Sequence, residues 1–291
     1  MCAVRERVRI CYGGRMHRIF PAALLIALLA NANTVSRQEQ SGHAYLGFDR
    51  NDYPGDAAMA ELRKQFVFTG YWLTPPPEEK TNSWTGKRGI LQHQGYGFLL
   101  LARGRPLSKI GNTAVARQAG KADALAAARN ARTEGFRSGA LVFLDVEDGG
   151  RLPAPYHEYL KSWADELLKE GFRPGVYCSG VPVNEGQGAT IVTAEDIRVN
   201  EAPRKLAYWV FNDACPPSPG CITLSNPPLP KASGVNDAAV WQIVRSPRQK
   251  ETAGGCAGYA ADGHCYAGVD AAHRWFLDVD IASSANPSFA P

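Results

Sequence analysis

Carboxyl groups follow an apolar stretch at one point of this sequence. The segment ALVFLDVEDGG, residues 140–150, sets Asp145, Glu147 and Asp148 directly behind a run of small and apolar residues. Such a run predicts a buried strand, so acids at its end must share a pocket or find polar partners. Crowded carboxyl groups raise one another's pKa, and one of them can then keep a proton for general acid catalysis.

Two other apolar stretches carry acids in the same way. Asp49 ends residues 44–49, and Asp278 and Asp280 lie two positions apart within residues 275–282. Residues two apart in a strand point to the same side, which should bring each such pair into one pocket. We therefore expect catalytic roles for Glu147, Asp145, Asp49 and Asp278.

The alternative for each acid is a structural role. We expect Asp52 to be a loop acid, Asp148 to turn outward and Asp56 to cap a helix. A salt bridge from a neighbouring arginine would make the whole cluster structural, and the candidates are Arg50, Arg103 and Arg151.

Aromatic and amide side chains near the same strand ends suit a sugar ligand, although each aromatic alone could simply be core. Gln242 is the clearest case, because an amide deep in a strand needs a polar partner. The residues we expect to contact substrate are Asp280, Tyr71, Trp209, Trp241 and Gln242.

The elements that must position these residues alternate along the chain. Helical patterns cover 116–134 and 155–170, with weaker ones at 56–64, 83–93 and 194–200. Eight strand candidates lie at 44–49, 66–72, 96–102, 140–147, 173–179, 205–211, 238–244 and 275–282. Continuous apolar strands alternating with helices favour a parallel sheet that is covered on both faces.

Eight such units fit a single-domain α/β fold, a (β/α)8 TIM-like barrel, whose typical length is about 250 residues. Long Pro/Gly-rich loops, 212–237 and 245–270, follow the sixth and seventh strands. The other candidate is an open doubly wound sheet, but no glycine-rich nucleotide loop follows the first strand. The C-terminal strand ends form the active-site face of a barrel, so the acids should converge there.

The N-terminus predicts export. Residues 1–32 join five arginines, the 12-residue apolar run 19–30 and an Ala-x-Ala site, which is the layout of a signal peptide. The run is shorter than the roughly 20 residues of a membrane span, although an uncleaved anchor is the alternative. Translation could start at Met1 or Met16. We expect a secreted protein, extracellular or periplasmic, with a flexible lead-in at 33–43, a barrel at 44–286 and a tail at 287–291.

Charge and cysteine content narrow the partners. The leader holds five of the 32 basic residues and one of the 28 acidic ones, so the remainder is balanced and offers nothing to nucleic acid. Two close cysteine pairs predict disulfides in an oxidising compartment, and Cys178 is expected to be a buried free thiol. Zinc is the weaker alternative, since no CxxC spacing exists. The paired residues would be Cys215 with Cys221 and Cys256 with Cys265.

The motifs GFD (47–49), LDVE (144–147), PGVYCS (174–179), WQ (241–242) and DVD (278–280) together resemble the family 25 glycoside hydrolases. Those proteins are secreted barrel lysozymes that cleave the glycan of peptidoglycan. A related secreted family, described as glycoside hydrolase-like and without a firmly assigned activity, is more similar still. The resemblance covers about residues 44–286.

The resemblance implies that Glu147 is the general acid, with Asp145 two residues before it, Asp49 on the first strand and Asp278 on the last. Asp280 stands where the family usually has Asn. A secreted, monomeric glycosidase of an amino-sugar polymer such as peptidoglycan follows, without metal or other cofactor and without membrane contact after signal cleavage. The alternatives are a carbohydrate-binding barrel without catalysis and a serine or metal hydrolase, for which no GxSxG or HExxH motif is present.

Overall fold

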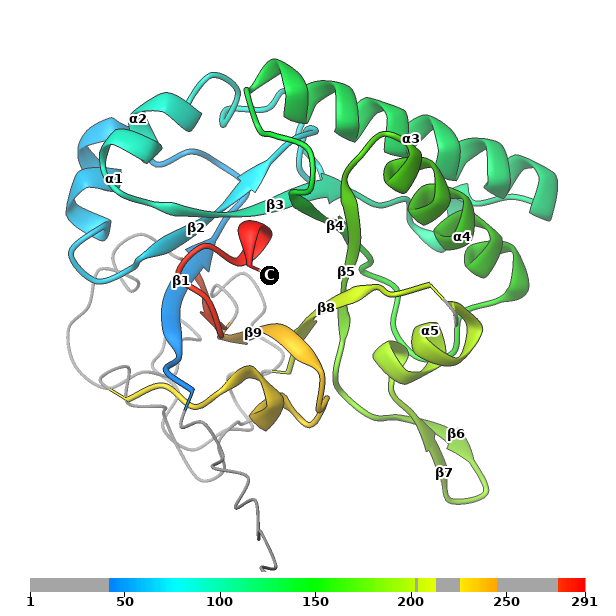
Figure 1. Cartoon of the computed structure of the whole chain (residues 1–291). Coiled ribbons are helices and arrows are strands. Elements are labelled where there is room, and N and C mark those ends of the chain that lie inside the picture. Colours follow the sequence, from blue (N-terminus) through cyan, green and yellow to red (C-terminus); the bar gives the residue numbers. More distant parts are fainter. Residues whose placement is uncertain (1–41, 202–203, 213–225, 245–276, 291) are drawn as a thin grey trace, which may run out of the picture. The chain divides into compact units, whose positions relative to one another are not determined.

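The structure, a computed structural model, describes residues 42–201, 204–212, 226–244 and 277–290. Its centre is a closed barrel in which the strands follow one another in the order β1-β10-β9-β8-β5-β4-β3-β2 (Figure 1). These strands are β1 (Tyr45–Asp49), β2 (Phe68–Trp72), β3 (Gly97–Arg103), β4 (Leu141–Asp145), β5 (Arg173–Ser179), β8 (Ala207–Phe211), β9 (Ala238–Val244) and β10 (Asp278–Ala282). The predicted eight-stranded α/β barrel is confirmed.

The last strand departs from the expected parallel arrangement. β10 runs antiparallel to both of its neighbours, β1 and β9, whereas the other barrel strands pair in parallel. An antiparallel neighbour needs no helical crossover, so the chain can close the barrel without one. The start of β10, not its end, therefore lies beside the C-terminal ends of the other strands.

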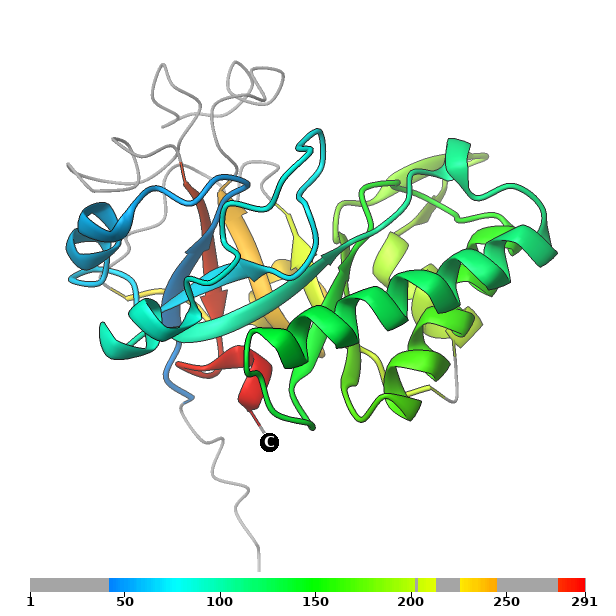
Figure 2. The ribbon, with the colours of Figure 1, turned by 90° about the horizontal axis from the view of Figure 1, so that it is seen from above.

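Helices cover part of the barrel wall. They are α1 (Asp56–Leu62), α2 (Arg88–His93), α3 (Thr113–Thr133), α4 (Ala154–Lys169) and α5 (Thr193–Glu201). All five lie at the predicted places, with ends displaced by up to five residues. Asn112 caps α3, because its side chain accepts hydrogen bonds from the amides of Ala114 and Val115. Helices α3, α4 and α5 lie on the side of β4 and β5, while α1 and α2 lie beside β1–β3 (Figures 1 and 2).

One exposed hairpin was not predicted. Strands β6 (Val183–Gly186) and β7 (Ala189–Ile191) form a separate two-stranded sheet between β5 and α5. Arg151, in the loop after β4, makes a bidentate salt bridge to Glu185 of the hairpin, at 2.8 Å for each bond. The hairpin is thereby tied to the loop that carries the candidate acids.

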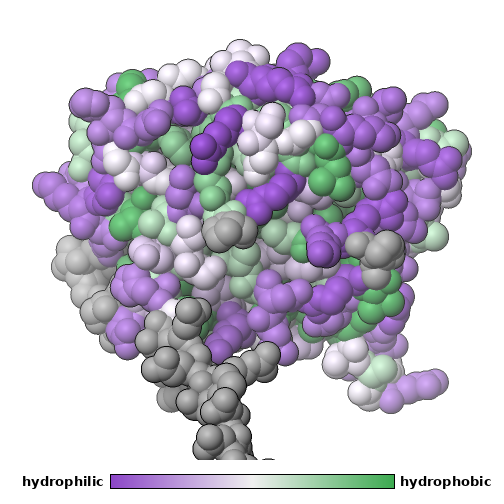
Figure 3. Space-filling view, in the orientation of Figure 1, coloured by the Kyte–Doolittle hydropathy of each residue, from purple (hydrophilic) through white to green (hydrophobic). Residues whose placement is uncertain are grey.

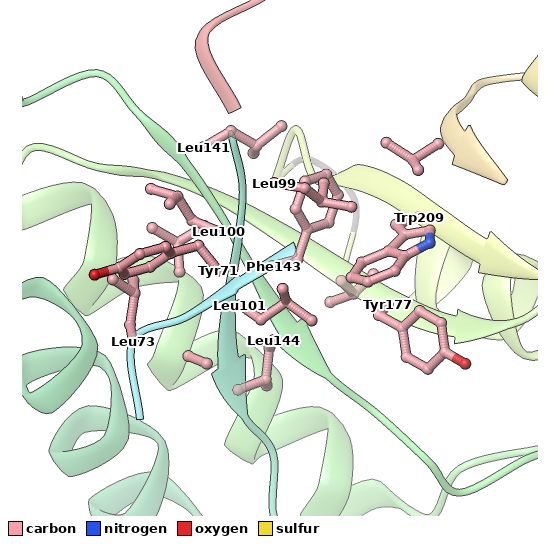
Figure 4. Packing of buried hydrophobic residues seen from close by; sticks show 14 of the residues in the cluster. Tyr71, Leu73, Leu99, Leu100, Leu101, Leu141, Phe143, Leu144, Tyr177 and Trp209 are labelled. Carbon is pink, nitrogen blue, oxygen red and sulfur yellow. The ribbon is translucent and has the colours of Figure 1, made fainter. Parts of the chain in front are cut away.

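The sheet of the barrel is buried on both its inner and its outer face. Figure 4 shows Phe143, Trp209 and Tyr177 on one side of the sheet, and Tyr71 with Leu100 on the other. The first group fills the barrel, and the second packs between the barrel and its covering segments. All five side chains are at most 6% exposed. This two-sided burial explains why the strands are apolar throughout.

The segment after β10 closes one end of the barrel. Residues Pro287–Phe289 form the short helix η3, and the Ser288 hydroxyl accepts a hydrogen bond from the Leu100 amide at 2.8 Å. Asn286 accepts another from the Phe98 amide. The described part of the predicted tail, residues 287–290, is therefore packed against β3. The face of the molecule shown in Figure 3 is mainly hydrophilic, with small separate apolar areas.

Several predictions fall on residues outside the described part of the chain. These are the leader at 1–32, most of the lead-in at 33–43 and the two disulfides of Cys215, Cys221, Cys256 and Cys265. In the described residues Cys178 is a buried free thiol, as predicted. The helices described here include none that is both long enough and apolar enough to span a membrane.

Candidate active site

Four acids from three strands meet at one end of the barrel. Asp49 ends β1, Asp145 ends β4, and Asp278 is the first residue of β10. Asp278 pairs directly with Asp49, and Asp280 lies two residues deeper, opposite Gly47. The expected convergence is present, but Asp278 reaches it for a different reason, because β10 runs antiparallel.

A chain of hydrogen bonds crosses the barrel interior to Asp49. The Tyr177 hydroxyl donates to Gln242 Oε1 at 2.8 Å, and Gln242 Nε2 donates to Asp49 Oδ2 at 2.9 Å. All three side chains are at most 6% exposed. Burial raises the pKa of Asp49 from its usual 3.8 to about 7, against the opposing effect of the Gln242 hydrogen bond. The polar partner expected for Gln242 is thus Asp49.

Asp280 is the most deeply buried acid, with no solvent exposure. Its Oδ1 accepts a hydrogen bond from Trp209 Nε1 at 3.1 Å, whereas Oδ2 has no hydrogen-bond partner among the residues that the structure describes. Burial raises the pKa of Asp280 well above its usual value, and the charge of Asp49 and a hydrogen bond to it add to this. The pKa values of both buried acids are therefore raised by burial.

Asp145 and Glu147 also meet, although not as expected. β4 ends at Asp145, so Glu147 lies in the following loop and is exposed, while Asp145 is 5% exposed. The prediction of a strand running to residue 147 was therefore wrong. Burial, then the charge of Glu147 and a hydrogen bond to its carboxyl group, raise the pKa of Asp145 well above 3.8. The buried acid therefore keeps a proton to higher pH than an isolated carboxyl group would.

Nearby arginines do not neutralise this pair. Arg103 stands opposite Asp145 in the β3–β4 register and lowers the pKa of Asp145, but less than burial raises it. Arg151 pairs with Glu185 and lies 3.5 Å from Asp196. Arg50 lies 3.8 Å from Asp52. Within the described residues, no salt bridge from an arginine to Asp145 or Glu147 is present.

Asp148 and Asp52 have structural contacts, whereas the prediction that Asp56 caps a helix was wrong. Asp148 accepts a hydrogen bond from the Leu107 amide at 2.7 Å, which ties the loop after β4 to the loop after β3. Asp52 lies beside Arg50. Asp56 is the first residue of α1 and not its cap, since Gly55 occupies the cap position, and the Asp56 carboxyl accepts from the Tyr53 hydroxyl at 2.9 Å.

Two of the expected sugar-binding aromatics lie away from the acids. Tyr71 faces outward from the barrel, and its hydroxyl donates to Glu134. Trp241 also faces outward, and its Nε1 donates to the backbone carbonyl of Asn212 at 3.1 Å. Both are at most 1% exposed. Of the five residues expected to contact substrate, only Asp280, Trp209 and Gln242 join the interior network.

Sequence reasoning missed two residues of the network. Tyr177 was noted only as part of a motif, yet its hydroxyl orients Gln242. Gly70, inside β2, leaves room for Asp49, because a Cβ there would lie 2.6 Å from Asp49 Cβ. A glycine within a strand is itself a signal of close approach, so FTGYW could have indicated this contact.

The arrangement can perform acid–base chemistry at a carboxyl-lined mouth. One exposed acid, Glu147, is backed by a buried acid of raised pKa, Asp145, and a second buried pair of raised pKa, Asp49 and Asp280, lies nearby. Among the described residues, no group of three or more His, Cys, Asp or Glu side chains has the arrangement of a metal site.

Similarities to known proteins agree with this chemistry. Residues 78–214 match the family described as "Rv2525c-like, glycoside hydrolase-like domain". No curated protein matches the sequence significantly.

Similar solved structures share the fold at low identity. An uncharacterised protein from B. stearothermophilus is 19% identical, with a TM-score of 0.51, over 82% of this chain and 95% of its own. The spore cortex lytic enzyme SleM of Clostridium perfringens is 15% identical, with a TM-score of 0.47, over 83% and 68%. A lysozyme from Streptomyces coelicolor is 12% identical, with a TM-score of 0.44, over 83% and 92%. The first of these similarities shows the fold alone. The matched residues 78–214 run from the segment after β2 through β8, so the similarity to the Rv2525c-like, glycoside hydrolase-like domain covers the part of the barrel that carries Asp145 and Glu147.

Proposed function

We propose that the protein hydrolyses glycosidic bonds of an amino-sugar polymer such as peptidoglycan. The observation that carries this proposal is the pair Asp145 and Glu147, in which a buried acid of raised pKa hydrogen bonds with an exposed one at the barrel mouth. Glycosidases of most families use two carboxyl groups that flank the scissile bond, one as general acid and one facing the sugar ring, and Glu147 is the candidate for the first of these.

Glu147 is the member of the pair that reaches substrate, because it alone is exposed. In its protonated form Glu147 gives its proton to the leaving oxygen as the glycosidic C–O bond breaks, and the water that adds to the sugar carbon later returns a proton to Glu147. Between these two steps the Asp145 hydroxyl donates its hydrogen bond to the Glu147 carboxylate. This donation stabilises the charge as it develops on Glu147. Asp145 is a positioning residue here, because it acts through Glu147.

Asp278 is the second carboxyl group at the mouth. It is half-buried at the start of β10 and pairs with Asp49 of β1. Asp145 lies on β4, on the opposite side of the barrel. We assign to Asp278 one of two roles: it stabilises the positive charge that develops on the sugar ring, or it orients a substrate N-acetyl group. The hydrogen bonds that join Tyr177 to Gln242 and Gln242 to Asp49 hold the side chains beneath Asp278 in place.

The assay is incubation with peptidoglycan, chitin oligomers and other polysaccharides, with products identified by mass. Glu147→Gln should lower kcat by about 100-fold to 10,000-fold on any substrate that the unmodified protein cleaves, because the general acid is lost. The matched control is Glu170→Gln, at the end of α4, where an acid pairs with Arg132 on the surface. Unchanged hydrolysis by Glu147→Gln would refute the assignment.

A carbohydrate-binding barrel without catalysis remains a distinct function, and the structure does not favour it. Such a module needs aromatic faces open to a sugar, yet Tyr71, Trp209 and Trp241 are all buried. Glycan binding that survives Asp145→Asn and Glu147→Gln, with no turnover by the unmodified protein, would establish it instead.

The proposed function includes export to the extracellular or periplasmic space, where such a polymer is found. Support comes from the basic and apolar pattern of residues 1–32. N-terminal sequencing of the exported protein should begin close after Ala32, and a protein that keeps residues 19–30 would contradict cleavage.

A further inference from the structure

A hollow lies in the surface beside the acids at the barrel mouth. It has a volume of about 500 Å³ and lies between the segments that follow β2 and β3 and the side of α3. Four basic and two acidic side chains line it: Lys80, Arg103, Arg105, Lys109, Glu79 and Asp123. We refer to it below as the basic groove.

Much of this positive charge is not neutralised within the groove. Arg105 makes a bidentate salt bridge to Asp123, with bonds of 2.7 and 2.8 Å. With Asp123 paired to Arg105, the other charged lining residues are one acid, Glu79, and three bases, which are Lys80, Arg103 and Lys109. Those three side chains are exposed and form no salt bridge within the described part of the chain. The groove thus offers an anion several donors that its own wall does not occupy.

The basic groove and the acidic mouth share one wall. Arg103 lies opposite Asp145 in the β3–β4 register, and its charge acts on that acid. The next residue, Gly104, passes so close to β4 that a Cβ would lie 2.0 Å from the backbone oxygen of Asp145. Further along, the Leu107 amide bonds to Asp148. A ligand that reached from the acids at the barrel mouth to the basic groove would cross only this shared wall.

We propose that the basic groove binds a carboxylate-bearing substituent of the glycan whose sugar ring lies at the acidic mouth. This inference rests on the proposed function, because it assigns the substrate of the same site. The mouth is lined by acids and repels an anion, whereas the groove attracts one through charge-assisted hydrogen bonds from lysine and arginine. The opposite charges of the mouth and the groove determine how the glycan is positioned along the site. The substrate is therefore an acidic polymer, and its carboxylates contribute to binding.

The test uses soluble peptidoglycan fragments with free stem-peptide carboxylates and the same fragments with those groups amidated. For the unmodified protein, amidation should raise KM with kcat unchanged. The double variant Lys80→Gln/Lys109→Gln should raise KM for the acidic fragments about fivefold to tenfold and leave KM for the amidated fragments unchanged. The control variant is Lys64→Gln/Lys205→Gln, which removes two exposed lysines from the segments before β2 and β8, at the other end of the barrel.

Three results would overturn the inference while leaving the proposed function in place. These are a KM that does not respond to amidation, a KM that does not respond to the groove variant, or an equal loss in the control variant. If no fragment is cleaved, the proposed function fails, and sedimentation of the protein with native and amidated insoluble peptidoglycan decides the inference. Equal bound fractions on both materials would then refute the groove as an anion site, and salt-sensitive binding to the native material that is lost in the groove variant would support it.

Discussion

Replacing Asp280 with Asn tests the proton balance of the barrel interior. Asn keeps an oxygen for the Trp209 Nε1 donor and supplies an amide donor toward Asp49, but it cannot ionise. In the unfolded chain Asp280 loses its proton near pH 3.8, whereas in the folded protein burial raises its pKa well above that value. Folding at neutral pH therefore requires proton uptake by Asp280, and folding of the Asn variant does not.

The magnitude follows from the linkage between protonation and folding. Each pH unit above the unfolded pKa costs about 1.4 kcal/mol while the folded group keeps its proton. From pH 3.8 to pH 7 the cost approaches about 4 kcal/mol, which is an upper limit because the Asp49 and Asp280 titrations are coupled. Because the pKa of Asp280 is higher in the folded protein than in the unfolded chain, the free energy of unfolding falls as pH rises. Asp280→Asn should thus match the unmodified protein near pH 4 and exceed its free energy of unfolding by up to about 4 kcal/mol at pH 7.

Urea unfolding at several pH values between 4 and 7 measures this difference. The matched control is Asp52→Asn, which makes the same substitution at a side chain that is 46% exposed and lies outside the interior network. Parallel free-energy curves for Asp280→Asn and the unmodified protein would show that Asp280 is not a protonated donor in the folded state. The interior network described above would then be wrong.

Further predictions concern the same network and the wall beside it. Gln242→Leu removes the donor to Asp49 and should raise the Asp49 pKa above 7 in an NMR titration; it should also cost about 1–3 kcal/mol of unfolding free energy, and an unchanged pKa would contradict the hydrogen bond. Gly104→Ala forces a Cβ onto the backbone oxygen of Asp145 and should cost about 1–3 kcal/mol, whereas Gly149→Ala, with open space around it, should cost far less in the same thermal unfolding assay. Equal losses in the two alanine variants would refute the close approach of the loops.

Local pattern was enough to predict most of the fold. The apolar runs mark all eight barrel strands and the helical periodicity marks all five helices, because burial on two faces or one face leaves a direct trace in composition. The hairpin β6–β7 was missed because its residues are exposed and carry no such trace. The antiparallel direction of β10 could not be predicted either, because the apolar pattern of a strand is the same for both directions.

The candidate site was predicted in part. Asp49, Asp145 and Asp280 were identified because a carboxyl group after or within an apolar strand is anomalous in itself. Tyr71 and Trp241 were expected beside them, and the structure turns both outward. An aromatic side chain is equally stable on either face of a strand buried on both sides, so its sequence position does not reveal which face it takes.

The sequence by itself determined which groups could do chemistry and that they lie at strand ends, because hydrophobic burial and helix periodicity are local properties. Only the tertiary structure decided which acids keep a proton. That depends on burial by residues far along the chain, as in the bonds that join Tyr177 to Gln242 and Gln242 to Asp49. Proton affinity is set by the distance and desolvation of groups in space, and neither is encoded in the spacing of residues along the sequence.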